Sequence, residues 1–546
     1  MSIETAGASP EVATSLHRGT NWWGAFVIGL AGTILVTGIV PFAVQSMGAA
    51  AIPAIVLVVL IGMVVCLCMG ELAALLPHRT GGMPSYAYDS FKPLGESTAR
   101  HVGGLCSWSY WLGWFPVAPI NMLLAASYIA VLFHVPLGRS FSPIGSLGSP
   151  VSVGVMLITI GGLVALFIPC YLGIRLGATF ATILGVTSMV PLTLLVLLPA
   201  FKPSTFHWSN VAGFHFADPK TAGTVFFLSW IFVISWNAIA MEAAACYIGE
   251  CRDPRRDAKI ALTVEGIYGV FIYVATAVVF VGVLGASLKT ADPLTLYTSF
   301  TDRIFGSSGW VKYVIGLPLV IALLLSVLNA VMGVARSLFQ ASEDRLIPKF
   351  FGHKNKHHVP DRAMIFNVVC AIAVAFFGSP VRIYIFSNVG YIIAVAASLF
   401  GYFLLRQMRP DLRSPFRMPD YFRWIALGCG LFLAFDYFVG GWNSPNIVVG
   451  PGQGHTLYLL GFVVVAVYVP LHLRRRATDK RDGLAPLGSL AVIEGSPGGI
   501  DFDESEPHIV EPAMATPLAM APEGMAVGGV DPLPTMSSHT LPDIDT

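Results

Sequence analysis

Long apolar stretches recur along this chain and are separated by short polar segments. A helix needs about 20 apolar residues to cross the hydrocarbon core of a bilayer. Twelve stretches meet or approach that length, at residues 22–45, 50–76, 103–133, 151–174, 177–199, 222–248, 259–286, 309–341, 363–378, 383–405, 423–440 and 456–473. The pattern predicts an all-α membrane protein with 12 transmembrane helices over residues 22–473.

Positive charge is distributed unevenly between the predicted loops. Of the 32 Lys and Arg residues, 24 lie in the terminal segments and the loops on one side, 7 lie on the other side, and Arg336 lies within a span. Because Lys and Arg accumulate on the cytoplasmic side, we expect both termini in the cytoplasm and the protein in the cell membrane. The first apolar segment continues without a small-residue cleavage site, so no removable signal peptide is expected.

Two segments outside the spans complete the predicted organisation. Residues 1–21 form a cytoplasmic N-terminal segment. Residues 474–546 are rich in Pro, Gly, Ala and acidic residues, which predicts a disordered cytoplasmic tail. A docking or regulatory tail is the alternative.

Composition excludes several classes of function. Hydrophobic residues make up 55% of the chain and charged residues 12%, unlike a soluble globular domain. A net charge of +1 without a clustered basic face argues against a nucleic-acid partner. The eight cysteines lack metal-binding or redox spacing and are interpreted as packing residues. No cofactor loop or nucleophile constellation is present, so we expect neither an enzyme, a cofactor nor a metal site.

The sixth stretch carries unusual polar residues. Ser235, Asn237 and Glu242 lie among small alanines within residues 230–254. A carboxylate in hydrocarbon costs on the order of 3 kcal/mol, so such residues usually face protein or a water-filled pathway. Alternatively, Glu242 lies near a helix end and reaches cytoplasmic water.

The first stretch is weakened by Gly29, Gly32, Gly38 and Pro41. A broken transmembrane helix offers unpaired backbone groups that can bind a carboxylate, an ammonium or an ion. Close helix packing through small residues is the alternative. Because a second interruption follows five spans later, the pair indicates a transporter site in which spans one to five are repeated, inverted, as six to ten.

Four motifs make a family resemblance specific. They are ELAALLP at 71–77 with GG at 81–82 and SYAY at 85–88, SYWLGW at 109–114, GECRDPRR at 249–256, and RSLFQASEDRLIP at 336–348. In this order they resemble the amino acid, polyamine and organocation (APC) superfamily of secondary transporters. The loop after the second span lacks the signature of the major facilitator family, which disfavours that twelve-span alternative.

The resemblance implies a LeuT-like 5+5 inverted-repeat fold with discontinuous helices 1 and 6, and a substrate that carries an amine. Backbone groups would bind the substrate carboxylate, polar groups its amine, and an indole would cover the pocket. The expected substrate-binding residues are Gly32, Thr37, Gly38, Ser235, Trp236, Asn237 and Ala240. Mere packing is the alternative role for Trp236.

Two residues depart from the family pattern. Val36 and Ala240 stand where many relatives have glycine. We therefore expect either that the first break shifts toward Gly38 or that the carboxylate site is narrower.

Coupling ions are predicted less directly. Glu242 and Glu265 are the proton-coupling candidates, with an ion pair between Glu265 and Arg336 or a loop arginine as the alternative. Ser188 stands where some proton-coupled relatives place a lysine. Ser326 and Asn329 are weak sodium candidates, because such residues more often bond neighbouring helices.

These observations predict a secondary transporter that moves an amino acid or related amine by alternating access, coupled to H⁺ or exchanging. Its partners would be a small-molecule substrate, the lipid bilayer and H⁺. A diamine or organic-cation exporter or exchanger is one alternative. A membrane sensor or scaffold that transports nothing is another.

Overall fold

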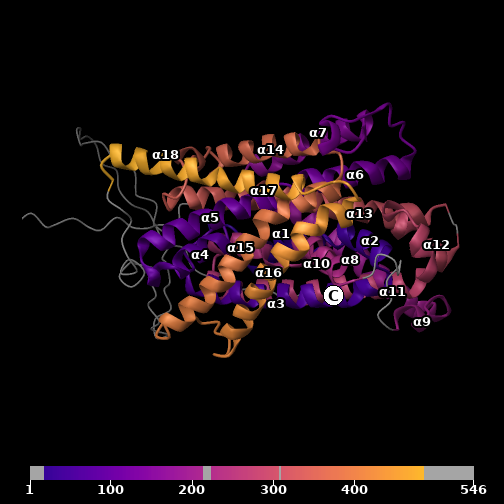
Figure 1. Cartoon of the computed structure of the whole chain (residues 1–546), viewed down its shortest axis with the longest axis horizontal. Coiled ribbons are helices and arrows are strands. Elements are labelled where there is room, and N and C mark those ends of the chain that lie inside the picture. The colour runs from indigo at the N-terminus through magenta and orange to yellow at the C-terminus, as the bar shows by residue number, and fades with distance from the viewer. Residues whose placement is uncertain (1–17, 213–222, 307–308, 485–546) are drawn as a thin grey trace, which may run out of the picture. The chain divides into compact units, whose positions relative to one another are not determined.

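The computed structural model describes residues 18–212, 223–306 and 309–484, which are mostly helical (Figure 1). They belong to one compact unit, Met1–Asp501, and a second unit, Phe502–Thr546, lies outside the described residues. The α-helices are α1 (Trp22–Thr33), α2 (Val36–Met47), α3 (Ala51–Leu75), α4 (Met83–Ser90), α5 (Glu96–Trp114), α6 (Val117–Phe133), α7 (Val153–Tyr171), α8 (Ile174–Phe201), α9 (Trp208–Val211), α10 (Thr224–Ala238), α11 (Pro254–Leu284), α12 (Leu296–Phe305), α13 (Val311–Glu343), α14 (Asp361–Ala375), α15 (Pro380–Met408), α16 (Phe422–Ser444), α17 (Thr456–Ala466) and α18 (Tyr468–Arg481).

Short elements connect these helices. The strands β1 (Ser140–Phe141) and β2 (Val151–Ser152) pair antiparallel, with Ser140 opposite Ser152. The 3-10 helices are η1 (Gly48–Ala50), η2 (Lys92–Leu94), η3 (Gly145–Leu147), η4 (Pro203–Thr205), η5 (Ala240–Glu250), η6 (Gly285–Thr290), η7 (Pro293–Thr295) and η8 (Lys349–Gly352), and η9 (Pro445–Val449) is a π-helical turn.

Ten helical stretches among the described residues are long and apolar enough to cross a membrane. One of them, Trp22–Leu75, contains α1, α2 and α3 and covers the first two predicted spans. Helix α14 has 15 residues and is not among the ten, although it occupies the ninth predicted span. The chain is therefore an all-α, multi-pass membrane protein, and the number of 12 crossings stays a prediction.

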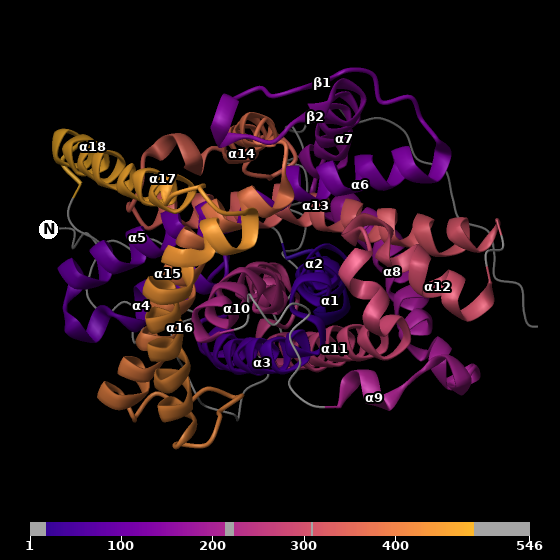
Figure 2. The same cartoon turned by 45° about the vertical axis from the view of Figure 1, so that its right-hand side comes forward.

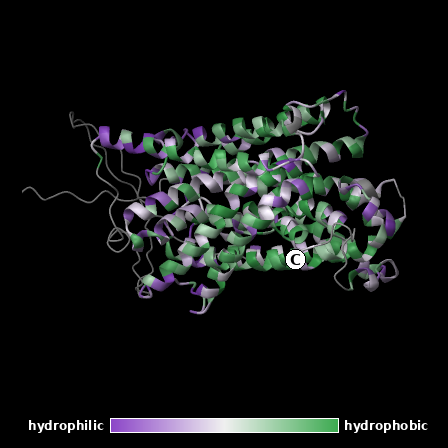
Figure 3. Cartoon of the chain, viewed as in Figure 1, coloured by the Kyte–Doolittle hydropathy of each residue, from purple (hydrophilic) through white to green (hydrophobic). Residues whose placement is uncertain are grey.

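Burial separates inner helices from outer ones. Every residue of α10 from Leu228 to Ala238 is buried, as is all of η5. Outer helices expose large apolar side chains, among them Leu157, Leu194, Val369, Phe438 and Val463. Figure 2 places α1, α2 and α10 in the middle of the helices, and Figure 3 shows hydrophobic residues along most of each long helix. Apolar surface of this extent is stable against lipid rather than water.

The first predicted span is interrupted between α1 and α2. Helix α1 begins after Asn21, whose side chain caps it by accepting the N–H of Gly24 at 3.1 Å. It ends at Thr33, and the intervening Ile34 and Leu35 keep near-helical angles (φ −79°, ψ 4° and φ −59°, ψ −9°). The interruption thus precedes Val36, and its irregular hydrogen bonds continue to Gly38, whose amide donates to the carbonyl of Leu35 at 2.9 Å.

The sixth predicted span changes its winding after α10. The chain passes through Ile239 and continues as η5, a 3-10 helix of 11 residues. Runs longer than 3–4 residues are uncommon because 3-10 hydrogen bonds have poorer geometry, and a 3-10 stretch within a helix often marks a hinge. Ala240, expected to oppose an opened turn, begins this tighter helix.

The end of α18 corrects the predicted start of the tail. Residues 474–481 are helical, not disordered. Burial explains the difference, since Arg475 donates to Asp479 at 2.8 Å and to the carbonyls of Ser342 and Ile347 at 3.0 Å each. The rest of the predicted tail from residue 485, and residues 1–17 of the predicted N-terminal segment, lie outside the described residues.

Candidate functional site

The backbones of α1 and η5 lie against each other. A Cβ atom on Gly32 would overlap the carbonyl oxygen of Ala240, and one on Gly29 would lie 2.5 Å from the amide nitrogen of Ala244. Only glycine permits this approach. The two interrupted segments predicted to form one site are therefore in direct contact.

Backbone groups at the first interruption depart from the regular helical pattern. The amides of Thr37 and Gly38 donate to carbonyls three residues earlier, at 3.2 and 2.9 Å. The carbonyl of Ala31 accepts the hydroxyl of Ser326 at 2.8 Å. Pro41 lies inside α2 and lacks an N–H, so the carbonyl of Thr37 receives no helical bond from it.

Trp236 lies between α5 and α15. Its indole Nε1 donates to the carbonyl of Gly113 at 2.7 Å, and its ring centre lies 4.9 Å from that of Tyr384. The hydroxyl of Tyr384 would lie 2.7 Å from a Cβ on Gly38. The structure thus connects Trp236 to Gly38 through a tyrosine that sequence reasoning missed.

Buried polar groups with few protein partners gather near Gly38. Among the described residues, the amide oxygen of Asn121 has no hydrogen-bond partner, and the hydroxyl of Tyr384 and the side-chain amide of Asn237 have none except each other. The Asn121 oxygen would lie 3.9 Å from a Cβ on Gly38, and Asn237 adjoins Trp236 in the chain. An unsatisfied buried polar group costs about 1–3 kcal/mol, so a cluster of them is suited to a polar ligand.

The other predicted substrate residues are placed less favourably for direct binding. Thr37 and Ser235 are buried, and their hydroxyls donate to carbonyls of their own helical segments, at 3.1 and 2.7 Å. Their oxygens keep the capacity to accept a hydrogen bond. Ala240 contributes its carbonyl to the contact with Gly32.

Glu242 is fully buried within η5 and does not reach water, contrary to the alternative interpretation. Its carboxylate accepts the hydroxyl of Tyr110 at 3.2 Å and that of Tyr391 at 2.8 Å. Tyr110 belongs to α5 and Tyr391 to α15. The acid therefore connects η5 to two neighbouring helices.

Glu265 in α11 contacts the same 3-10 helix. One of its oxygens accepts the amide of Ala244 at 3.1 Å, and the other has no partner among the described residues. The alternative pairing with Arg336 is wrong, because Arg336 pairs with Glu250. Both proton-coupling candidates thus hold η5 in place. Glu242 belongs to η5 and bonds outward through its carboxylate, whereas the carboxylate of Glu265 bonds to the backbone of η5.

The weak sodium candidates lie on one face of α13 near the interruption. Ser326 bonds to Ala31, as described above, and Asn329 accepts the hydroxyl of Tyr247 at 2.7 Å. Both residues bond neighbouring segments, as expected for polar residues in membrane helices. In the described part of the chain, no group of three His, Cys, Asp or Glu residues is arranged for a metal ion.

Ion pairs fasten the segment that follows α3. Arg79 pairs with Asp344 and, at 2.6 Å, with Asp89, which also pairs with Lys92 at 2.5 Å. Burial alone would raise the pKa of Asp89, but Arg79 and Lys92 outweigh it and hold that pKa below the ordinary value.

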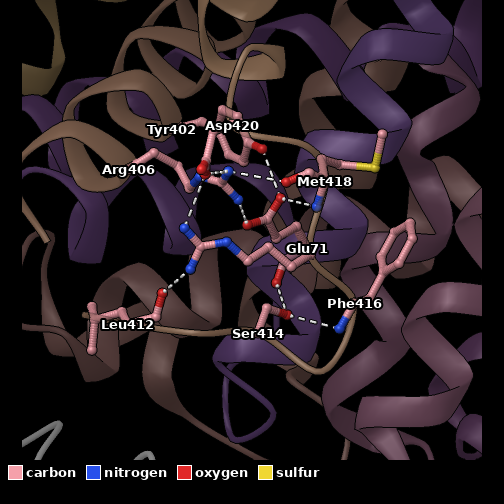
Figure 4. Close-up of polar contacts among 9 residues, drawn as sticks. Glu71, Tyr402, Arg406, Leu412, Ser414, Phe416, Met418 and Asp420 are labelled. Atoms are coloured by element: carbon pink, nitrogen blue, oxygen red, sulfur yellow. Dashed lines mark hydrogen bonds and ion pairs between the residues drawn. The ribbon is translucent and has the colours of Figure 1, made fainter. Parts of the chain in front are cut away.

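A second cluster lies at the end of α3 (Figure 4). Glu71 pairs with Arg406 and accepts the hydroxyl of Tyr402 at 2.7 Å and the amide of Met418 at 2.9 Å. The backbone carbonyl of Glu71 also accepts the hydroxyl of Ser414 at 2.9 Å. These contacts attach α15 and the segment before α16 to α3.

Comparisons with known proteins agree with this architecture. A family model described as amino acid permease matches residues 21–467. The glutamate/gamma-aminobutyrate antiporter of Lactococcus lactis subsp. lactis is 24% identical over 43% of this chain, which spans 50% of the antiporter's length. The cadaverine/lysine antiporter of Escherichia coli K12 is 25% identical over 62% of this chain and 70% of its own length.

A further relative matches along more of its length. The methylthioribose transporter of Bacillus subtilis is 22% identical over 84% of this chain and 96% of its own length. These relatives and the matching family are transporters, not enzymes. Because the family model covers most of the 546 residues, the chain is an APC superfamily permease and belongs to the amino acid permease family.

Proposed function

We propose that this permease is a secondary transporter that moves an amino acid or related amine across the cell membrane by alternating access. It crosses the membrane 12 times, with both termini in the cytoplasm and with α1–α2 and α10–η5 as corresponding discontinuous helices of a 5+5 inverted repeat. The supporting observation is the cluster of buried polar groups near Gly38, in which the Asn121 oxygen has no partner and Tyr384 and Asn237 have none except each other.

The substrate would bind between the two interruptions. Backbone groups of Gly32, Thr37 and Gly38 would receive its carboxylate, while Asn237 and the oxygen of Ser235 would receive its amine. Trp236 would cover the pocket beside the carbonyl of Ala240. An indole face suits either an apolar side chain or a cation.

Coupling would run through the acids that hold η5. Glu242 would exchange a proton or attract a cationic substrate, and Glu265 would exchange a second proton. Sodium coupling through Ser326 and Asn329 is the weaker proposal, because both residues are engaged in bonds between helical segments. Flux measured with and without sodium, and across a pH gradient, separates these ions.

Exchange of a diamine is the second candidate. The buried carboxylate of Glu242 and the similarity to a cadaverine/lysine antiporter favour it. Vesicles loaded with cadaverine should then accelerate entry of labelled lysine or cadaverine, whereas a simple amino acid importer shows no such acceleration by cadaverine. A sensor or scaffold would transport nothing and would lose function when residues 483–546 are deleted.

The test of the site is Trp236→Ala in proteoliposomes supplied with labelled lysine, glutamate, leucine or cadaverine. We expect saturable uptake of the transported compound to disappear. Trp236→Phe, which keeps a ring but loses the bond to Gly113, should retain partial uptake. Trp208→Ala is the matched control, because Trp208 is 72% exposed. Normal uptake by a folded Trp236→Ala protein would overturn the pocket assignment.

A further inference from the structure

A cavity of about 430 Å³ lies among the start of α5, the segment after α13 and the end of α18. Its basic lining residues are Arg100, His101, Arg345, His472, Arg476 and Lys480. We call it the basic cavity. Its lining includes no residue of α1, α2, α10 or η5, so it is separate from the proposed substrate site.

The charge of the basic cavity is positive. Four Lys and Arg residues line it against two acids, Glu96 and Asp479, which leaves a formal charge of +2 with neutral histidines. Both acids already have partners, since Asp479 pairs with Arg475 at 2.8 Å and Glu96 accepts the hydroxyl of Tyr88 at 2.8 Å. The cavity therefore favours an anion.

Two of the cations are positioned to receive that anion. Arg476 and Lys480 are four residues apart on α18, and so lie on one helix face. Both are exposed, and within the described residues neither side chain forms a hydrogen bond or an ion pair. Neither side chain is held away from the cavity by a protein acid.

Nearer the N-terminal end of α18, the same helix face carries apolar side chains. Val469 and Leu473 are 55% and 58% exposed, and with Arg476 and Lys480 they follow the spacing of one helical stripe. An apolar stripe that leads into a basic cavity matches a phospholipid, whose acyl chains adjoin its phosphate. A soluble phosphate compound has no apolar chain that could pack against Val469 and Leu473.

We propose that the basic cavity binds the phosphate headgroup of an anionic phospholipid, with the acyl chains along Val469 and Leu473. Basic pockets between transmembrane helices are suited to such headgroups. This site is independent of the transported substrate and of the coupling ion.

The test titrates dioleoylphosphatidylglycerol into the purified full-length protein in detergent, at about 0.15 M salt, where charges more than about 8 Å apart are screened. The melting temperature should rise saturably, and dioleoylphosphatidylcholine should raise it less. Arg476→Gln combined with Lys480→Gln should weaken apparent binding roughly 30-fold, from about 1 kcal/mol per basic residue.

The matched control is Arg474→Gln combined with Arg481→Gln. It removes the same charge from the same helix at exposed positions outside the cavity lining, and should leave binding unchanged. Equal weakening in both double variants would show diffuse surface attraction and overturn the proposal. Saturable stabilisation by glycerol phosphate or inorganic phosphate that matches the lipid would overturn the choice of a lipid, and absence of any stabilisation would overturn the site.

Discussion

Glu242 is a buried acid whose two oxygens each accept a tyrosine hydroxyl, from Tyr110 and Tyr391. The ring of Tyr391 also lies 6.4 Å from that of Trp114, next to Gly113, which accepts the indole of Trp236. The orientation of Glu242 is thus linked to the residues proposed to enclose the substrate. We therefore expect a proton or cation bound at Glu242 to alter the contacts of Tyr391, Trp114 and Trp236.

We predict that Tyr391→Phe lowers the maximal transport rate between about fivefold and a hundredfold. The change removes one hydrogen bond, worth about 1 kcal/mol or up to about 3 kcal/mol with a charged partner. Initial rates in proteoliposomes measure the effect. Tyr437→Phe is the matched control, because this buried hydroxyl has no partner among the described residues. Similar rates for both variants would show that the bond to Glu242 does not contribute to transport.

His78 provides a pH-dependent contribution to stability. Burial, followed by the neighbouring Arg79, lowers the pKa of His78 to about 4 from 6.5. At pH values between these two, His78 binds a proton in the unfolded chain but stays neutral in the folded protein. The free energy of unfolding therefore falls as pH drops from 6.5 to 4. The pKa difference corresponds to at most about 3.5 kcal/mol.

We therefore expect His78→Gln to reduce the loss of melting temperature between neutral pH and the lower end of that interval. His207→Gln, at an exposed histidine, should keep the loss of the unmodified protein. Melting curves in one detergent across this pH range provide the measurement. If His78→Gln and the unmodified protein lose stability in parallel, the burial of a neutral imidazole is not the cause.

At the scale of elements, the interrupted helices depend on contact between backbones. We predict that Gly32→Ala destabilises the protein by about 1–3 kcal/mol, because the new methyl group overlaps the carbonyl of Ala240 and neither backbone can yield. Gly161→Ala on α7 has open space around the added Cβ atom and should stabilise by about 0.5–1 kcal/mol. Melting temperatures compare the two. A neutral Gly32→Ala change would mean that α1 and η5 separate freely.

Sequence patterns predicted the positions of the helices along the chain better than the hydrogen bonds and contacts between them. Glycine and proline spacing predicted the interruption in the first span, and a polar group among alanines predicted the one in the sixth. The 3-10 winding of η5 and its close backbone contact with Gly29 and Gly32 were not predicted, because no spacing of apolar residues encodes either of them. The partner of Glu242 on α15 is 149 residues away in sequence, beyond the reach of any spacing argument. Tyr110 lies within the SYWLGW motif at 109–114, but its contact with Glu242 arises only from the fold.

For the whole molecule, the proposed alternating access requires that one end opens while the other stays closed. Glu71 lies near the C-terminal end of α3 and Arg79 in the segment that follows it, and their ion pairs attach α15, α4 and the end of α13. If this end opens during the proposed transport cycle, such contacts must break. The amide of Met418 reports on one of them directly, because it donates to Glu71 at 2.9 Å (Figure 4).

We predict that Glu71→Gln speeds hydrogen exchange of the Met418 amide and lowers stability by about 3–5 kcal/mol. A glutamine has one acceptor oxygen for three donors and leaves the buried guanidinium of Arg406 with only the exposed Asp420 as a charge partner. Asp420→Asn is the control. Its side chain is 74% exposed, so losing its pair with Arg406 should cost at most about 1 kcal/mol and leave exchange nearly unchanged. Exchange mass spectrometry of the segment before α16 distinguishes them. If Glu71→Gln left the exchange of Met418 slow, the Glu71 cluster would not hold this end closed, and the barrier to opening would lie with the ion pairs of Arg79.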